Sequence, residues 1–346
     1  MLLKERLNNN YDFLRVSAAL CITLTHSYNL ILKNDDEPLM KLTGNRFDFS
    51  FIGLSIFFSI SGYLITKSAV TSSSFKNYMW KRFLRIQPML MLVCLLSVFL
   101  IGPFFSSLNM NEYFREQDTY TYFRNIMPLF GIQFTLPQVF SHNLAENGVN
   151  GSLWSLIVEE RLYLMLGLPF LFKSFGKKIL LSLILILNVL FFLHFAFFNE
   201  NLIKYFNGIH VFYALIFLNS SAFFLLDVDF SEYSKSVLIF LGIISLLILS
   251  IFSSLEKSIH IILLPFIVII IAHLKGFTNK AGKYGDFTYG VYAFSFPVQQ
   301  MLISSNLVVH NPFNLFMVTL LFVVPIAFLT WHLMEKKMLV LKNRVK

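Results

Sequence analysis

The sequence predicts an all-α membrane protein, a polytopic bundle of about ten transmembrane helices with both termini in the cytoplasm. Of its 346 residues, 56% are hydrophobic and only 14% are charged, and the mean hydropathy is +0.66. This composition is far too apolar for a soluble domain. The apolar residues also gather in runs long enough to cross a bilayer, which takes about 20 residues per helix. We therefore expect one integral-membrane domain that covers residues 1–346.

Ten apolar runs of spanning length follow one another along the chain. They cover residues 11–32, 49–69, 84–105, 152–172, 178–198, 208–226, 236–253, 257–274, 286–306 and 313–334. A further apolar segment, residues 120–140, is interrupted by Pro128, Gly131 and Pro137. Proline and glycine disfavour an uninterrupted helix, so this segment is expected to be interfacial or re-entrant.

The positions of the lysines and arginines indicate the orientation in the membrane. If the N-terminus is cytoplasmic, most of the 28 basic residues fall on the cytoplasmic side, above all in residues 67–85 and in the C-terminal tail. This agrees with the positive-inside rule. The acidic loop with Asp227 and Asp229 disagrees, but acidic residues weigh little in that rule. The net charge of +9 is then explained by membrane orientation, and no nucleic-acid partner is expected.

The first apolar run carries three ionisable residues, Asp12, Arg15 and His26. Such residues are costly at membrane depth, so they indicate a functional site by default. Arg15 and His26 are eleven residues apart, which places them on one face of a helix and about 16 Å apart along its axis. The alternative is that Arg15 reaches to the membrane interface and that His26 is a hydrogen-bonded core residue.

A second stretch, NGSLWSLIVEERLY at residues 150–163, opens the fourth apolar run. If that run begins at Ser152 on the outer surface, Glu159 lies about 10 Å below the surface, and His26 lies about 9 Å below it. The shared depth predicts a carboxylate–imidazole pair suited to base catalysis. Alternatively, Glu160 pairs with Arg161 and Glu159 lies at a helix–helix contact.

A third stretch, YMWKRFLRIQP at residues 78–88, contains Lys81, Arg82 and Arg85 where the third run leaves the cytoplasm. A basic cluster in this position is typical of membrane anchoring or lipid head-group contact. It is equally suited to a phosphate site, because the arginine guanidinium offers planar, bidentate geometry to phosphate oxygens.

Five motifs in this order resemble the acyltransferase-3 family, whose members are integral-membrane enzymes that acylate bacterial surface sugars. The motifs are FLRVSAALCITLTHSY, FFSISGYLI, KRFLRIQP, NGSLWSLIVEERLYL and TYGVYAFSFPVQQ. The resemblance extends over nearly the whole chain, and it is to the short members that lack an additional esterase-like domain. One departure is Ser295, because many members carry a histidine there.

The resemblance and the residue patterns together define a candidate site. The expected catalytic residues are His26, Glu159 and Arg15, the expected acyl-CoA-binding residues are Lys81, Arg82 and Arg85, and the expected substrate-pocket residues are Asn150, Ser152 and Trp154. Ser295 is left out of the catalytic set. No metal site is expected.

The resemblance implies an O-acyltransferase of the bacterial cytoplasmic membrane. Its donor would be acetyl-CoA and its acceptor a glycan or a lipid-linked sugar, with membrane lipids around it. The alternative is a proton-coupled secondary transporter that uses Arg15, His26 and Glu159. The chain shows no evident inverted repeat, which disfavours the transporter.

Overall fold

The computed structural model describes residues 9–32, 36–143, 148–198, 208–228, 241–242, 244, 256–274, 277–307 and 311–343. Within these ranges the protein is helical and has no β-strand, only an isolated bridge between Ser106 and Val139. The longer helices are α2 (Tyr11–Leu32), α4 (Phe49–Thr71), α5 (Phe75–Leu96), α9 (Trp154–Gly167), α10 (Gly176–Ala196), α11 (Ile209–Leu225), α13 (Glu256–His273), α14 (Thr288–Ser304) and α15 (Pro312–Thr330). The all-α prediction is confirmed for this part of the chain.

Shorter elements connect the long helices. They include α3 (Pro38–Leu42), α6 (Gly102–Phe105), α7 (Met110–Arg115), α8 (Gln117–Thr121) and α16 (Lys336–Val340). A π-helical turn, Ser97–Ile101, joins α5 to α6, and another, Trp331–Glu335, joins α15 to α16. The segment that the sequence marked as interrupted forms only α8 and short 3₁₀ turns as far as Phe130.

Five helices in the described ranges are long and apolar enough to cross a membrane. They are Phe49–Thr71, Phe75–Phe105, Gly176–Ala196, Glu256–His273 and Pro312–Val340. Helices also cover the other expected runs except residues 236–253, which lie almost entirely outside the described residues. A multi-pass membrane protein is therefore supported, while the number of ten spans stays a prediction.

Two expected boundaries differ from the structure. The third helix begins at Phe75, because Ser74 caps it by accepting a hydrogen bond from the backbone N–H of Asn77 (3.1 Å). The basic cluster thus lies inside α5. Its charges lower the hydropathy of the first turns, so the apolar run was predicted to begin later. The fourth helix, α9, has only 14 residues before a 3₁₀ segment, Leu168–Phe175, takes over.

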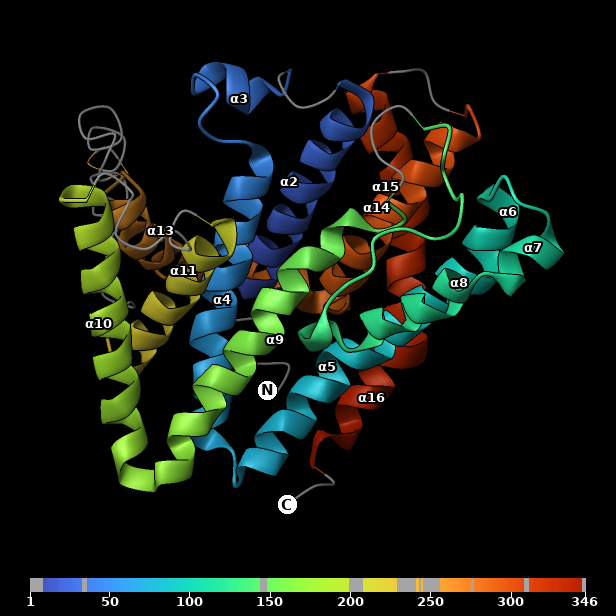
Figure 1. Cartoon of the computed structure of the whole chain (residues 1–346). Coiled ribbons are helices and arrows are strands. Elements are labelled where there is room, and N and C mark those ends of the chain that lie inside the picture. Colours follow the sequence, from blue (N-terminus) through green and yellow to red (C-terminus); the bar gives the residue numbers. More distant parts are fainter. Residues whose placement is uncertain are drawn as a thin grey trace.

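Small residues bring α4 and α11 close together at the centre of the bundle (Figure 1). A Cβ atom at Gly62 would lie 2.1 Å from the carbonyl oxygen of Phe217, so only glycine fits there. Ser220 on α11 donates a hydrogen bond to the carbonyl of Ser59 on α4 (2.6 Å). Close backbone approach and interhelical hydrogen bonds are the usual means of helix association in membranes.

Helix α14 is held against α2 by polar contacts inside an apolar interior. Thr23 Oγ1 donates to Ser295 Oγ (2.9 Å), and Gln299 Nε2 donates to the carbonyl of Thr23 (2.9 Å) and to Ser27 Oγ (2.7 Å). Ser295 is therefore used for helix packing. These contacts fix α14 beside the face of α2 that carries His26.

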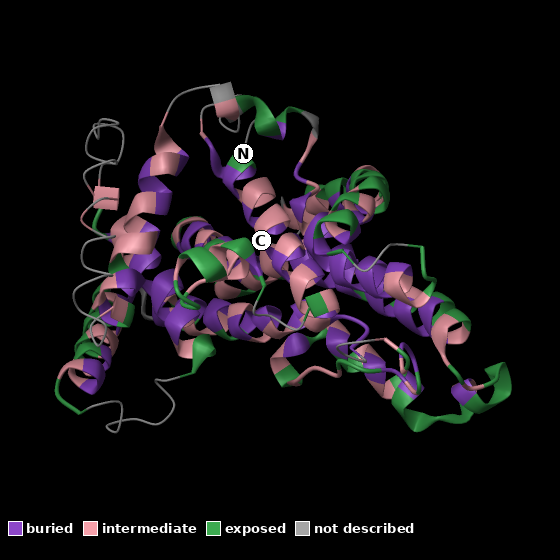
Figure 2. Ribbon diagram, turned by 90° about the horizontal axis from the view of Figure 1, so that it is seen from above, coloured by how far each residue is buried: buried purple, intermediate pink, exposed green. Residues whose placement is uncertain are grey.

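Apolar side chains remain exposed on the outer helices. Figure 2 marks all exposed residues in green on the ribbon seen from above. Leu185 and Ile186 on α10 are 66% and 55% exposed, and Leu321 on α15 is 73% exposed. A large exposed apolar surface on a folded protein marks a membrane or partner contact. On helices of spanning length, the surrounding lipid explains it.

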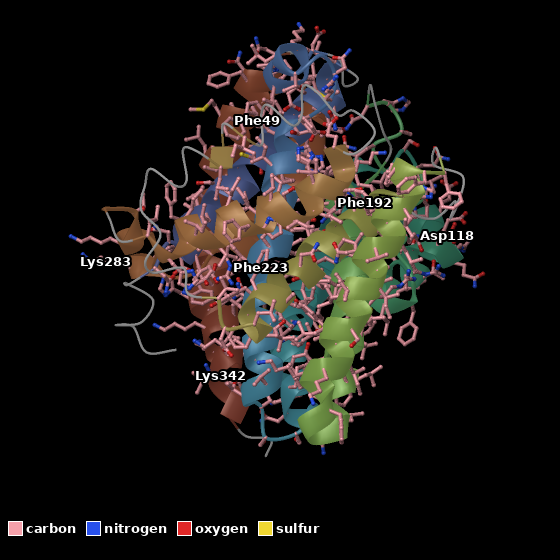
Figure 3. All side chains as sticks on the ribbon, turned by 90° about the vertical axis from the view of Figure 1, so that its left-hand side faces the viewer. Phe49, Asp118, Phe192, Phe223, Lys283 and Lys342 are labelled. Atoms are coloured by element: carbon pink, nitrogen blue, oxygen red, sulfur yellow. The ribbon has the colours of Figure 1, made fainter. Side chains whose placement is uncertain are left out.

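The connecting segments separate into two ends of the bundle. Figure 1 shows α3 at the upper end and α6–α8 at the right-hand side, whereas the α4–α5 and α9–α10 connections lie at the lower end. Figure 3 shows Phe49, where α4 begins, and Lys342, which follows α16, toward opposite ends. This sorting agrees with helices that cross the bilayer in alternating directions.

Candidate active site

The imidazole of His26 lies beside the start of α9. Its Nε2 atom is 3.2 Å from Ser152 Oγ, and its ring meets Phe296 of α14 edge to face with centroids 5.1 Å apart. A cavity of about 180 Å³ opens at this position. Its polar and aromatic lining includes Thr25, His26, Asn29, Asp48, Ser50, Phe51, Ser152, Trp154, Tyr213 and Tyr292. The structure thus brings together three predicted residues: His26, Ser152 and Trp154.

Hydrogen bonds from α14 hold the start of α9 deep in the bundle. Asn150 Nδ2 donates to the carbonyl of Ala293 (2.9 Å), and its Oδ1 accepts from the backbone N–H of Ser152 (3.2 Å). Tyr292 donates its hydroxyl to the carbonyl of Ser152 (2.5 Å). Asn150 is fully buried and does not line the cavity. Its observed role is to place Ser152, which differs from the pocket role predicted for it.

The predicted pairing of Glu159 with His26 is wrong. The prediction assumed that Ser152 lies at the outer surface, but Ser152 is buried at the level of His26. Glu159 follows seven residues later, which is about 10 Å farther along the helix. Its carboxylate instead accepts hydrogen bonds from Ser61 Oγ of α4 (3.1 Å) and from the hydroxyl of Tyr163, one turn along α9.

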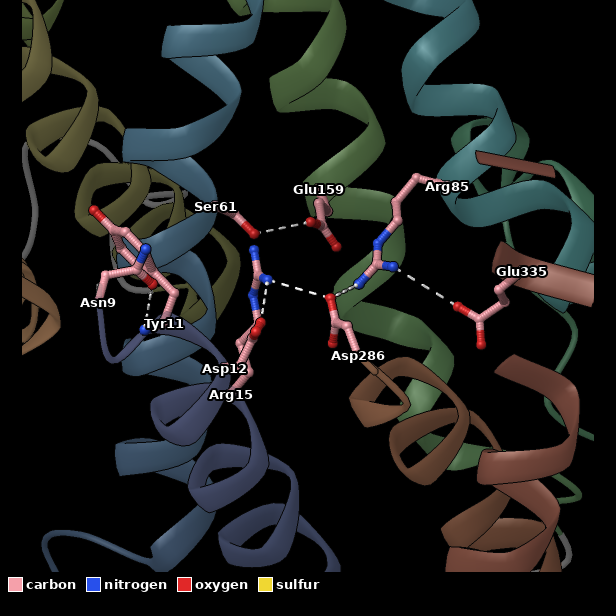
Figure 4. Close-up of polar contacts among 9 residues, drawn as sticks. All are labelled: Asn9, Tyr11, Asp12, Arg15, Ser61, Arg85, Glu159, Asp286 and Glu335. Carbon is pink, nitrogen blue, oxygen red and sulfur yellow. Dashed lines mark hydrogen bonds and ion pairs between the residues drawn. The ribbon is translucent and has the colours of Figure 1, made fainter. Parts of the chain in front are cut away.

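A second polar layer surrounds Arg15, nearer the start of α2 (Figure 4). Asp286, just before α14, accepts hydrogen bonds from Arg15 Nη1 (3.3 Å) and Arg85 Nη2 (2.7 Å) through the same oxygen, Oδ2. Arg85 Nη1 also lies 3.8 Å from Glu335 Oε2. Figure 4 places Glu159 beside this group. Arg15 and Glu159, which were predicted to act with His26, therefore belong with Arg85.

The other two basic residues of α5 have different surroundings. Arg82 lies over the ring of Tyr163 at 5.9 Å, and its Nη2 donates to Ser68 Oγ on α4 (3.4 Å). Lys81 Nζ donates to Ser72 Oγ in the turn between α4 and α5 (3.0 Å). Arg82 is thus linked through Tyr163 to the layer of Arg15, whereas Lys81 contacts the connection between α4 and α5.

Glu160 contacts groups other than Arg161, the partner that the alternative interpretation gave it. Its carboxylate accepts from Gln87 Nε2 of α5 (2.5 Å) and from the backbone N–H of Leu129 (2.6 Å). It therefore anchors the 3₁₀ turn Pro128–Phe130 against α5 and α9. The two adjacent glutamates of α9 serve different parts of the molecule.

Several residues of these two layers were missed by the sequence reading. They are Asp48 and Tyr292 at the cavity, and Asp286 and Glu335 at the arginines. For Asp286 and Glu335, the sequence did indicate that some carboxylates must lie near the arginines, because arginines within a membrane bundle require carboxylate partners. Nothing in the spacing indicated which carboxylates those are.

Burial raises the pKa of the Asp48 carboxyl above its ordinary value, although the N–H of Phe51 donates to it and opposes the shift. Asp48 therefore both caps α4 and brings a carboxyl group to the cavity of His26. The cavity combines imidazole, carboxyl, hydroxyl and aromatic groups, which can orient a polyhydroxylated ligand and accept its proton.

Comparison with known proteins identifies the family of the chain. A family model described as an acyltransferase domain matches residues 8–332. The chain is 31% identical over 344 residues to an "O-acetyl transferase" of Shigella phage Sf6, which covers 96% of each chain. It is 33% identical over 163 residues to "Nodulation protein 10" of Rhizobium leguminosarum bv. viciae, which covers 46% of this chain and 43% of that protein. No solved structure matches. The chain therefore belongs to the acyltransferase-3 family, as its five motifs indicated.

Proposed function

We propose that this protein moves an acetyl group from cytoplasmic acetyl-CoA to a hydroxyl of a bacterial surface glycan or lipid-linked sugar. The observation that carries the proposal is the division of α2 into two polar layers, an arginine layer at Arg15 and a cavity at His26. The two residues are about 16 Å apart along the helix. A donor held by its phosphates at one level can then present its acyl end toward the other.

The arginine layer suits the phosphates of an acyl-CoA. The side chains of Arg15 and Arg85 are each 23% exposed, so neither side chain is fully enclosed by the cluster. A guanidinium has five N–H donors in a planar fork that matches phosphate oxygens. Arg82 and Lys81 on the same helix add two further cations toward the proposed cytoplasmic end.

His26 is the proposed general base. A sugar hydroxyl is a poor nucleophile at neutral pH, and imidazole is the side chain best suited to take its proton. In this step the hydroxyl oxygen attacks the thioester carbonyl carbon while His26 accepts the hydroxyl proton. The C–S bond then breaks, and the proton passes to the departing thiolate to give the free thiol of CoA. Ser152, 3.2 Å from Nε2, is placed to orient the ring.

The same cavity is the proposed acceptor site. Trp154 and Tyr213 provide aromatic faces for the apolar side of a sugar ring, whereas Asp48 and Asn29 provide hydrogen-bonding groups for its hydroxyls. Two neighbouring rings hold Trp154 in place. The Trp154 ring is stacked on that of His210, with centroids 5.3 Å apart, and is tilted against that of Tyr213, with centroids 6.1 Å apart.

Transfer by the purified protein tests the proposal. The protein in lipid nanodiscs is supplied with radiolabelled acetyl-CoA and with polysaccharide from a host that lacks it. We expect labelled acetyl esters on the polysaccharide, visible as new acetyl signals by NMR, together with release of CoA. A transporter would release no CoA and would leave the polysaccharide unlabelled, which would overturn the proposal.

The proposed orientation makes a prediction for cysteine labelling. With Cys21 and Cys94 replaced, a single cysteine at Gln117 should react with a membrane-impermeant reagent from outside intact cells, and one at Lys177 should react only after the cells are opened. Both positions are exposed: Gln117 begins α8, and Lys177 lies in the first turn of α10. The opposite labelling pattern would reverse the orientation and remove the cytoplasmic donor from the proposal.

A further inference from the structure

One carboxylate oxygen joins the guanidinium groups of two arginines that come from different helices. Asp286 Oδ2 accepts from Arg15 of α2 at 3.3 Å and from Arg85 of α5 at 2.7 Å. The two donor nitrogens are therefore no farther apart than two hydrogen-bond lengths. The carboxylate of Asp286 is 6% exposed, and its residue precedes the first turn of α14 (Figure 4).

Two guanidinium groups at this separation repel each other, and the repulsion is strong in a partly buried site because the effective dielectric constant is low. The shared carboxylate between them offsets this repulsion. Arginine does not lose its proton in proteins, so neither partner can relieve the repulsion by becoming neutral. The close approach of Arg15 and Arg85 therefore depends on the negative charge of Asp286.

Each arginine also has a second carboxylate within reach. Arg15 Nη1 lies 3.5 Å from Asp12 Oδ1, one turn earlier on α2. Arg85 Nη1 lies 3.8 Å from Glu335 Oε2, at the junction of α15 and α16. Without the charge of Asp286, each guanidinium would keep only its own second carboxylate, and no shared negative charge would hold the two arginines together.

We propose that Asp286 is a positioning residue that holds Arg15 and Arg85 together as a two-arginine clamp for the phosphates of the acyl donor. This inference rests on the proposed function of the arginine layer. Asp286 does not contact the donor in this arrangement. It sets the separation of the two groups that do, and it ties them to the beginning of α14, whose later turns support the cavity of His26.

The test is a kinetic comparison of Asp286→Asn with the wild-type protein in nanodiscs. Asparagine keeps the size of the side chain but removes the charge that neutralises two cations. We expect the KM for acetyl-CoA to rise by tenfold or more, while the KM for the acceptor stays within twofold. Asp286→Glu, which keeps the charge, should recover part of the donor affinity. Asp118→Asn, at an exposed position of α8, is the matched control and should behave as wild type.

A double-mutant cycle separates positioning from a general loss of structure. In an Arg85→Ala background the clamp is already broken, so Asp286→Asn should raise the donor KM by no more than about twofold further. The inference is overturned if the two substitutions raise the donor KM by independent factors that multiply. It is also overturned if Asp286→Asn lowers the donor KM, which would mean that the wild-type carboxylate competes with phosphate for the arginines. If Arg85→Ala alone leaves the donor KM unchanged, the proposed donor site fails, and the two failures are thereby distinguished.

Discussion

Replacing His26 by alanine is expected to lower acyl transfer by 10²- to 10⁴-fold, the usual contribution of a general base. The side chain lies in the cavity, beside Ser152 and Phe296, and the helix around it is held to α14 by Thr23 and Gln299. The substitution therefore removes the imidazole without removing the contacts that place α2. Transfer of labelled acetyl groups to polysaccharide, measured at saturating donor, is the readout.

The control for this prediction is His142→Ala, because His142 is exposed in the segment that follows α8 and lies outside the cavity. Both variants should show the same yield in the membrane and the same thermal unfolding profile. The donor KM of the His26 variant should stay near that of the wild type, since Arg15 lies about 16 Å away along α2. Near-normal glycan acetylation by a well-folded His26→Ala protein would end the proposed mechanism.

Local features of the fold were readable from the sequence. Helix α2 has the bounds predicted for the first run, because its three ionisable residues are isolated within an otherwise largely apolar stretch. By contrast, α5 extends nine residues ahead of its predicted start, since Lys81, Arg82 and Arg85 depress the hydropathy of its first turns. Arg82 and Arg85 are tolerated there because they contact groups from outside α5: Arg85 donates to the carboxylate of Asp286, and Arg82 donates to the Ser68 hydroxyl and lies over the Tyr163 ring.

The site was predicted as a set of residues but not as an arrangement. The rise per residue gave the distance between Arg15 and His26 along one helix, and that distance separates the two layers. The depth of Glu159 relative to His26 required the position of α9 in the bundle, which is set by Asn150 and Tyr292 contacting residues more than 100 positions away. Such long-range contacts are not encoded in any local spacing.

Asp286 illustrates the same limit. Its partners Arg15 and Arg85 lie 271 and 201 residues earlier in the chain. The charges alone required that the arginines be neutralised, yet Asp12, Glu159, Asp286 and Glu335 were all available by composition. Only the fold shows that one oxygen of Asp286 serves both arginines.

Replacing Arg85 by alanine is expected to weaken binding of acetyl-CoA by roughly ten- to a hundredfold, with a smaller effect on the rate at saturating donor. A charge-assisted hydrogen bond contributes about 1.5–3 kcal/mol, which corresponds to that range of affinity. Isothermal titration of the nanodisc-embedded protein with CoA, or the donor KM, measures the change. Arg115→Ala, at an exposed position of α7, is the matched control.

Loss of the Arg85 charge also leaves Asp286 and Glu335 with one cation fewer, and both are buried. Breaking a buried ion pair from one side destabilises a protein by about 3–5 kcal/mol. Arg85→Lys separates this effect from donor binding, because it keeps the positive charge beside the carboxylates but lacks the bidentate fork. We expect Arg85→Lys to unfold at a temperature close to that of the wild type and still to bind CoA more weakly. If Arg82→Ala and Arg85→Ala both fold and bind CoA with unchanged affinity, the basic residues of α5 serve only to orient the protein in the membrane.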